Sequence, residues 1–190
     1  MRHSIRAEAS ALLESNGPAG LRARAVAEAA GTSTAAVYEL FGDKAGLIRS
    51  LYDDGFEQLQ TELEALKPSD DAASDVKALF QATRHFARKR PQLFEVMFAR
   101  PFEEFEPDVD ARTSGSLFSL VMDRVSRWLD DVGSSADSVD VSRVLISASR
   151  GLISDDNTGG LGTTAVSRNR RWDLTFDSLM AGIAGHTSGG

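Results

Sequence analysis

Apolar side chains recur every three or four residues along most of this chain, which is the spacing of one face of an α-helix. The pattern predicts a helix over residues 2–16, two short helices between residues 21 and 41, and a long helix from Lys44 to about Leu66. Five further helices are expected, over residues 72–88, 93–98, 117–132, 141–152 and 172–183. No stretch alternates as a strand would, so the fold class is all-α, with about nine helices.

Gly, Pro and clustered acidic residues separate these helices. Residues 101–110 are expected to form an acidic loop, residues 133–136 a linker, and residues 155–164 a flexible loop. Gly55 lies on the apolar side of the long helix, where Ala would favour the helix by roughly 1 kcal/mol. Two explanations stay open for it, close packing against a neighbouring helix and a bend in the long helix.

The two short helices between residues 21 and 41 form a distinct unit. Gly31 supplies the turn because only Gly enters left-handed backbone at low cost, and Thr32 or Ser33 offers an N-cap to the next helix. Val37 and Phe41 fall on the inner face of that helix. Two short helices around such a turn form a helix-turn-helix, whose second helix can enter the major groove of DNA. A plain corner between two helices is the alternative.

A resemblance to a known family favours the helix-turn-helix over a plain corner between two helices. The spacing of the residues in this region resembles the signature of the TetR (tetracycline-repressor) family of transcriptional regulators, and the resemblance covers roughly residues 5–55. It implies a three-helix DNA-binding domain over residues 1–46 and a helical effector-binding and dimerisation domain over residues 47–190. The positions that carry it are Ala27, Ala30, Gly31, Thr32, Ser33, Val37, Tyr38, Phe41, Lys44 and Leu47, with Ala9, Leu12, Leu13 and Gly17 upstream.

The same resemblance assigns candidate DNA contacts. Tyr38 and Lys44 would bind phosphates, and Arg24 would reach a guanine edge. Arg22 stands where the family usually has a Ser or Thr cap, and Glu39 is unusual for a residue that faces the groove. The full set of candidates is Arg22, Arg24, Ser33, Thr34, Ala36, Tyr38 and Lys44.

Seven of the ten Phe residues lie between positions 80 and 118, which gathers flat side chains in one region. An ordinary helical core is one explanation. Because TetR proteins bind a small effector in this half, the resemblance also makes these residues candidate lining of an apolar ligand pocket. The candidates are Phe86, Phe94, Met97, Phe98, Phe118 and Met122, with Thr83, Arg84 and His85 as possible polar selectors.

The last two helices are expected to pair with those of a second copy into a four-helix bundle, as the resemblance implies. Small side chains would let the helices approach closely, and aromatic side chains would supply buried area. The alternative keeps these residues inside one subunit. The candidate interface residues are Leu145, Ala148, Leu152, Trp172, Phe176 and Met180.

Charge and composition narrow the remaining choices. The net charge is −7, but residues 1–50 carry six basic and five acidic side chains, so only this part can approach phosphates without strong repulsion. The chain has no Cys, no apolar run long enough to span a membrane and no visible signal peptide, which suits a cytoplasmic protein. Its three His residues are too far apart in sequence to form a helical metal-binding pair. We expect no metal ion, no cofactor and no enzymatic activity.

These patterns predict a homodimeric DNA-binding transcriptional regulator. We expect a repressor that binds a palindromic operator in double-stranded DNA and leaves it when a small, largely apolar effector binds. The alternative is a helical ligand-binding or scaffold protein whose helix-turn-helix no longer reads DNA.

Overall fold

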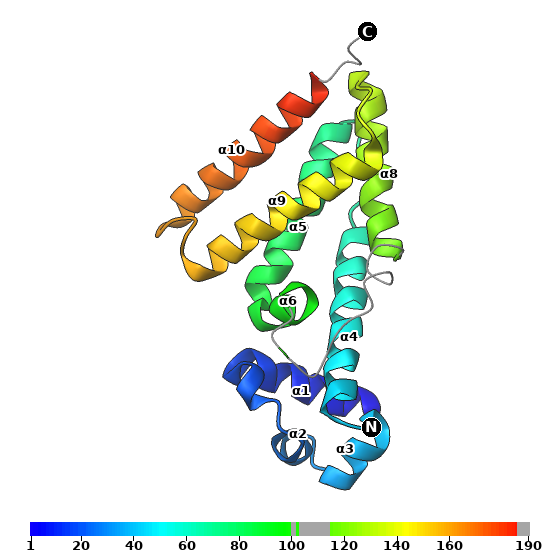
Figure 1. Cartoon of the computed structure of the whole chain (residues 1–190), viewed down its shortest axis with the longest axis vertical. Coiled ribbons are helices and arrows are strands. Elements are labelled where there is room, and N and C mark those ends of the chain that lie inside the picture. Colours follow the sequence, from blue (N-terminus) through cyan, green and yellow to red (C-terminus); the bar gives the residue numbers. More distant parts are fainter. Residues whose placement is uncertain (100–101, 103–114, 186–190) are drawn as a thin grey trace. The chain divides into compact units, whose positions relative to one another are not determined.

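The computed structural model describes residues 1–99, 102 and 115–185 (Figure 1). The described residues contain nine α-helices, one short 3-10 turn and no strand, which confirms the all-α prediction. The expected acidic loop over residues 101–110 lies outside the described residues, apart from Phe102. The helices are α1 (Arg2–Asn16), α2 (Ala23–Ala29), α3 (Thr34–Phe41), α4 (Lys44–Glu64), α5 (Ala72–Lys89), α6 (Pro91–Phe98), α8 (Ser116–Val132), α9 (Ser138–Thr158) and α10 (Ala165–Ala184), with the 3-10 turn η1 at Pro18–Gly20.

The chain divides into two compact units. The first comprises Met1–Leu59 and the described part of Phe86–Ala111, and the second comprises Gln60–His85 and the described part of Arg112–Gly190. Both α4 and α5 therefore contribute residues to each unit.

In the first unit, α1 and α4 are joined by an ion pair between Arg6 and Asp54 at 3.0 Å. Helix α6 is held at its N-terminus by α1, because the Glu14 carboxylate accepts the backbone N–H groups of Gln92 (3.2 Å) and Leu93 (2.8 Å). Pro91 has no N–H to offer, and the N-cap residue of α6 gives no side-chain cap, so Glu14 caps this helix from another one. The buried core of this unit includes Ile5, Ala9, Leu13, Val26, Val37, Leu47, Ile48, Leu51, Leu93 and Met97.

Gly55 of α4 lies against α6. A Cβ atom placed on Gly55 would come within 2.7 Å of the Met97 sulfur, 2.9 Å of Met97 Cγ and 3.3 Å of Leu93 Cδ1. Both neighbours are fully buried. Of the two explanations for this glycine, the structure supports close packing.

In the second unit, the buried Trp128, Trp172 and Phe176 form much of the apolar core. Arg84 of α5 is buried beside them, with its guanidinium carbon 4.7 Å from the centre of the Trp172 ring. Its Nε donates to Asp156 at 2.9 Å, and Arg168 of α10 lies 3.1 Å from the other oxygen of the same carboxylate. A buried charge is tolerated only when it is paired in this way.

This ion pair corrects one prediction. A flexible loop was expected from residue 155 onward, but α9 continues to Thr158 and ends at Gly159, whose φ is 85°. Asp and Asn have low intrinsic helix propensity, and two glycines follow, so the local signal is that of a loop. The prediction is wrong for residues 155–158 because the buried contacts of Asp156 with α5 and α10 stabilise the last helical turn.

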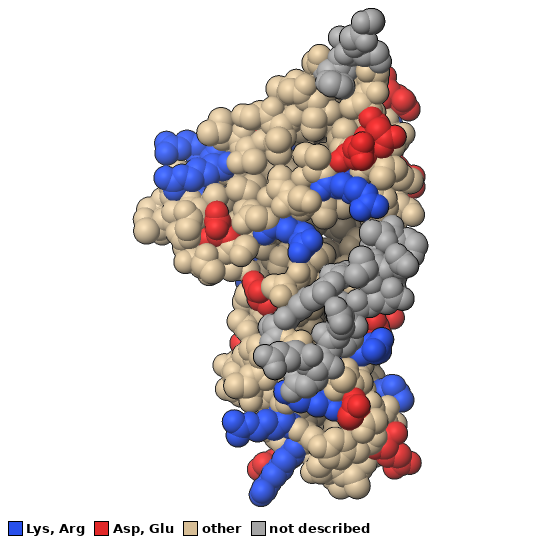
Figure 2. Space-filling model, viewed as in Figure 1, with Lys and Arg blue, Asp and Glu red and all other residues tan. Residues whose placement is uncertain are grey.

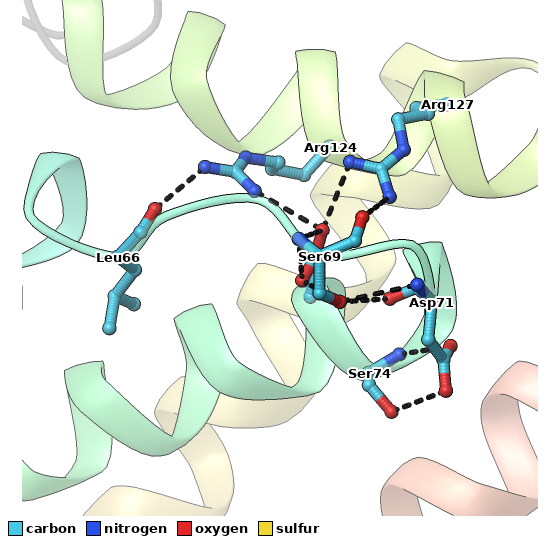
Figure 3. A network of polar contacts seen from close by, with 7 residues as sticks. Leu66, Ser69, Asp71, Ser74, Arg124 and Arg127 are labelled. Carbon is cyan, nitrogen blue, oxygen red and sulfur yellow. Dashed lines mark hydrogen bonds and ion pairs between the residues drawn. The ribbon is translucent and has the colours of Figure 1, made fainter.

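A second polar network ties the connection between α4 and α5 to α8 (Figure 3). The Asp75 carboxylate accepts the Ser69 N–H through both oxygens, each at 3.0 Å, and the Ser69 hydroxyl at 2.8 Å. Arg124 and Arg127 of α8 pair with the same carboxylate, and Arg124 also donates to the Leu66 carbonyl at 2.8 Å. The Ser69 N–H, more than any other contact, holds the pKa of Asp75 below its usual value, against the desolvation that raises it.

Candidate nucleic-acid interface

Helices α2 and α3 and their connecting turn have the geometry of a helix-turn-helix. Gly31 has a φ of 61°, in the left-handed region that glycine enters at low cost, and the Thr32 N–H returns to the Ala27 carbonyl at 2.9 Å. The Ser33 hydroxyl accepts the Ala36 N–H at 3.1 Å and so caps α3. The end of α3 at Phe41 and its Ser33 cap agree with the sequence prediction of a short helix that ends by residue 41 and is capped by Thr32 or Ser33.

Helix α3 buries one face and exposes the other. Val37 and Phe41 are buried, whereas Tyr38 is 48 % exposed, an unusual fraction for a large ring. Ser33 and Glu39 are exposed, and Thr34 and Ala36 are half-buried near the start of the helix. Of the predicted contact residues in this segment, Ser33 and Tyr38 are therefore accessible to another molecule, and Thr34 and Ala36 are partly accessible.

Basic side chains lie on the helices that precede and follow α3 in the chain. Arg22 and Arg24 are exposed at the start of α2, and neither has a carboxylate partner among the described residues. Arg22 is the N-cap residue of α2, and its side chain makes no capping hydrogen bond, which fits its departure from Ser or Thr at this position. Lys44, at the start of α4, is exposed and lies 5.5 Å from the centre of the Phe102 ring. Figure 2 shows Lys and Arg side chains over the helices of this part of the first unit.

The six candidate pocket residues are divided between the two units. Phe86, Phe94 and Met97 are buried in the first unit and Phe98 is half-buried there, with the Phe94 and Phe98 rings 4.6 Å apart. Phe118 and Met122 are half-buried in the second unit, where Arg143 lies 5.5 Å from the Phe118 ring centre. Of the polar candidates, Arg84 is committed to Asp156, and Thr83 donates its hydroxyl to the Leu79 carbonyl at 2.9 Å.

A surface depression of about 550 Å³ lies elsewhere, along α10. It contains none of the six candidate pocket residues. Its lining comes from one exposed face of a single helix, so it is a shallow surface feature that cannot enclose a ligand. The lining residues are Val166, Asn169, Arg170, Asp173, Leu174 and Asp177.

The candidate interface residues on α9 and α10 are mostly interior. Leu145, Trp172, Phe176 and Met180 are at most 5 % exposed in the single chain, so they have almost no area left to offer a partner. Ala148 and Leu152 are half-buried. The apolar side chains that these two helices expose are others, namely Val144 (48 %), Leu174 (64 %) and Val166 (79 %). The apolar stripe from which the candidate interface residues were predicted is therefore the inner face of each helix.

The fold and this site define an all-helical protein with a helix-turn-helix near its N-terminus. Residues 5–51 match the family model of the bacterial regulatory proteins of the tetR family, and residues 76–179 match the model of the tetracycline repressor-like C-terminal domain. The chain therefore belongs to the TetR family of transcriptional regulators. No match to a curated protein was found.

Solved structures share the fold over nearly the whole chain. A protein of unknown function from Rhodococcus sp. RHA1 is 24 % identical with a TM-score of 0.80, covering 96 % of this chain and 95 % of that one. PfmR from Thermus thermophilus, a TetR family transcriptional regulator, is 18 % identical with a TM-score of 0.66, covering 93 % of this chain and 97 % of that one. ActR from Streptomyces coelicolor, solved in complex with (S)-DNPA, is 18 % identical with a TM-score of 0.66, covering 96 % of each chain. Among the described residues, no helix is long and apolar enough to cross a membrane.

Proposed function

We propose that this TetR family regulator is a homodimeric, non-enzymatic repressor whose residues 1–46 bind a palindromic operator. The observation that carries the proposal is the accessible face of α3, where Tyr38 is half-exposed beside the buried Val37. Arg22 and Arg24, at the start of the preceding helix α2, have no carboxylate partner among the described residues, and an accessible helix with basic side chains on the helix before it suits a major groove and its phosphates.

Each contact has a distinct expected role. Lys44 contributes a charge to a phosphate and Tyr38 a hydroxyl, so neither reads sequence. Arg24 would read a guanine edge through two parallel hydrogen bonds. Arg22, Ser33, Thr34 and Ala36 complete the proposed surface.

Binding of labelled duplexes that tile the DNA flanking the gene tests this proposal. Lys44→Ala should weaken binding to every duplex and reduce the slope of log affinity against log salt by about 0.9 per protomer, because one fewer counterion is released. Tyr38→Phe should weaken binding to all duplexes by a similar factor. Arg24→Ala should instead cost about 1–3 kcal/mol on the operator only.

Lys67→Ala is the matched control for charge, because Lys67 is exposed and belongs to the second unit, whereas the proposed surface belongs to the first. If Tyr38→Phe and Lys44→Ala bind like the parent, the contact assignment is wrong. A parent protein that binds none of these duplexes more tightly than unrelated DNA would favour the alternative, a helical ligand-binding or scaffold protein.

The proposed dimer uses the outer faces of α9 and α10. Val144 and Leu174 are exposed large apolar side chains there, and a Cβ atom on Gly151 would meet nothing within 4 Å. An isologous pairing of two such faces would bury this area and leave small residues at the points of closest approach. Trp172→Arg would unfold the subunit before it tested this interface, because Trp172 is already buried.

The proposed effector is small and largely apolar. The candidates in the first unit, Phe86, Phe94, Met97 and Phe98, supply aromatic rings and a thioether, which adapt to flat apolar ligands. An effector acts only through its different affinity for the DNA-binding and released states, and a shift from 1:99 to 99:1 requires about 5.5 kcal/mol. Release of a bound operator by such a compound, with no release from a variant in which Phe98 is changed to Ala, would support this part of the proposal.

A further inference from the structure

Arg2 lies beside the end of α3 although 39 positions separate it from Phe41, the residue it contacts. It occupies the first turn of α1, and its guanidinium carbon is 5.3 Å from the centre of the Phe41 ring. Phe41 is the last residue of α3 and is 8 % exposed. The contact therefore fixes an exposed cation at the C-terminal end of α3.

Arg2 and Arg6 lie one turn apart on α1 but differ in their charge partners. Arg6 is paired with Asp54 at 3.0 Å, so its charge is neutralised within the protein. Arg2 is exposed and has no carboxylate partner among the described residues. A guanidinium that stacks on a ring uses its flat face and keeps the N–H donors at its edge available, and those donors match the oxygens of a phosphate.

The position of Phe41 connects Arg2 to the proposed DNA contacts. Tyr38 lies one helical turn before Phe41, and Lys44 begins α4 three residues after it. The contact with Phe41 therefore holds Arg2 against the end of the helix that carries Tyr38, three residues before Lys44 in the chain. We infer that Arg2 is a further phosphate-binding residue, so that the DNA interface extends from the helix-turn-helix onto α1. This inference rests on the proposed function.

The competing explanation is that Arg2 only covers the Phe41 ring. Only phosphate binding requires the positive charge of Arg2, whereas covering the Phe41 ring does not. Arg2→Leu retains an apolar cover over the ring and removes the charge, and Arg2→Lys retains the charge and replaces the fork of donors with a single ammonium group. Thermal unfolding of both variants, followed by circular dichroism, gives the change in stability separately from DNA binding.

A mixed-sequence 30-bp duplex is a sufficient probe, because phosphate contacts do not depend on sequence. Affinity is measured between 50 and 200 mM salt for the full-length parent, Arg2→Leu, Arg2→Lys and the control Lys67→Ala. We expect Arg2→Leu to reduce the salt slope by about 0.9 per protomer, and Arg2→Lys and Lys67→Ala to retain the parent slope.

The outcomes separate this inference from the function on which it rests. A parent that binds the duplex with a salt-dependent affinity, together with an unchanged slope in folded Arg2→Leu, overturns the role of Arg2 and leaves the proposed function standing. A parent that binds no duplex at any of these salt concentrations overturns both. A slope that falls equally in Arg2→Leu and Lys67→Ala also overturns the role of Arg2, because the effect would then be that of net charge alone.

Discussion

Replacing Gly55 with Ala should destabilise this protein although Ala is the better helix former. In an exposed helix interior the change would stabilise the fold by roughly 1 kcal/mol. At Gly55 the added methyl group would lie 2.7 Å from the Met97 sulfur, whereas non-bonded heavy atoms are most stable about 3.5–4.0 Å apart. Met97 would have to move by about 1 Å, and it is fully buried.

Overpacking of this kind costs about 1–3 kcal/mol. After subtraction of the helix-propensity gain, the expected net loss in the free energy of unfolding is about 0–2 kcal/mol. A sharper test is whether Gly55→Ala raises or lowers stability when it is made in the Met97→Ala variant. Met97→Ala removes the atoms that collide, so in that background Gly55→Ala should stabilise the protein by about 1 kcal/mol, even though Met97→Ala alone costs about 2–5 kcal/mol.

Urea unfolding of the four proteins at one fixed protein concentration measures this cycle, because dimerisation would make stability concentration-dependent. Gly182→Ala is the control, since Gly182 lies in α10 and an added methyl group there meets nothing within 4 Å. It should stabilise the protein by up to about 1 kcal/mol. If Gly55→Ala stabilises the protein equally in both backgrounds, the packing explanation is refuted, and a bend in α4 becomes the better account of this glycine.

Three further predictions follow from other contacts. Glu14→Ala should cost about 0.5–2 kcal/mol and speed hydrogen exchange of the Gln92 and Leu93 amides, because α6 loses its cap; unchanged exchange would contradict that role. The Ser69 N–H is the largest cause of the lowered pKa of Asp75 in the folded protein. The ionised Asp75 therefore stabilises the fold at pH values above its unfolded pKa of about 3.9, and this stabilisation is lost as the pH falls through the lower, folded pKa. The difference in urea midpoint between the parent and Asp75→Asn should therefore be full at pH 7 and shrink below about pH 4, and a constant difference would count against it. Leu174→Glu should give a folded monomer in sedimentation, because this exposed side chain is placed in the proposed interface, and a folded variant that stays dimeric would exclude Leu174 from it.

The sequence alone determined the helix-turn-helix, because the signals there are local. Gly31 has the left-handed backbone that a turn between two helices requires, Ser33 caps α3 from the adjacent position, and Val37 and Phe41 fall on one face by helical spacing alone. Each of these features depends on residues within one or two turns of each other. The family match over residues 5–51 agrees with them.

Only the tertiary structure decided what each apolar or charged face contacts. Periodicity marked Trp172 and Phe176 as buried, but burial inside one subunit and burial between two subunits leave the same stripe in the sequence. The last turn of α9 exists because Asp156 meets Arg84, which lies 72 positions away, and no local pattern reports that pair. For Gly55 the sequence left packing and bending equally open, since its neighbour Met97 comes from another helix. Contacts between distant positions carry no periodic signal, so these three outcomes required the folded chain.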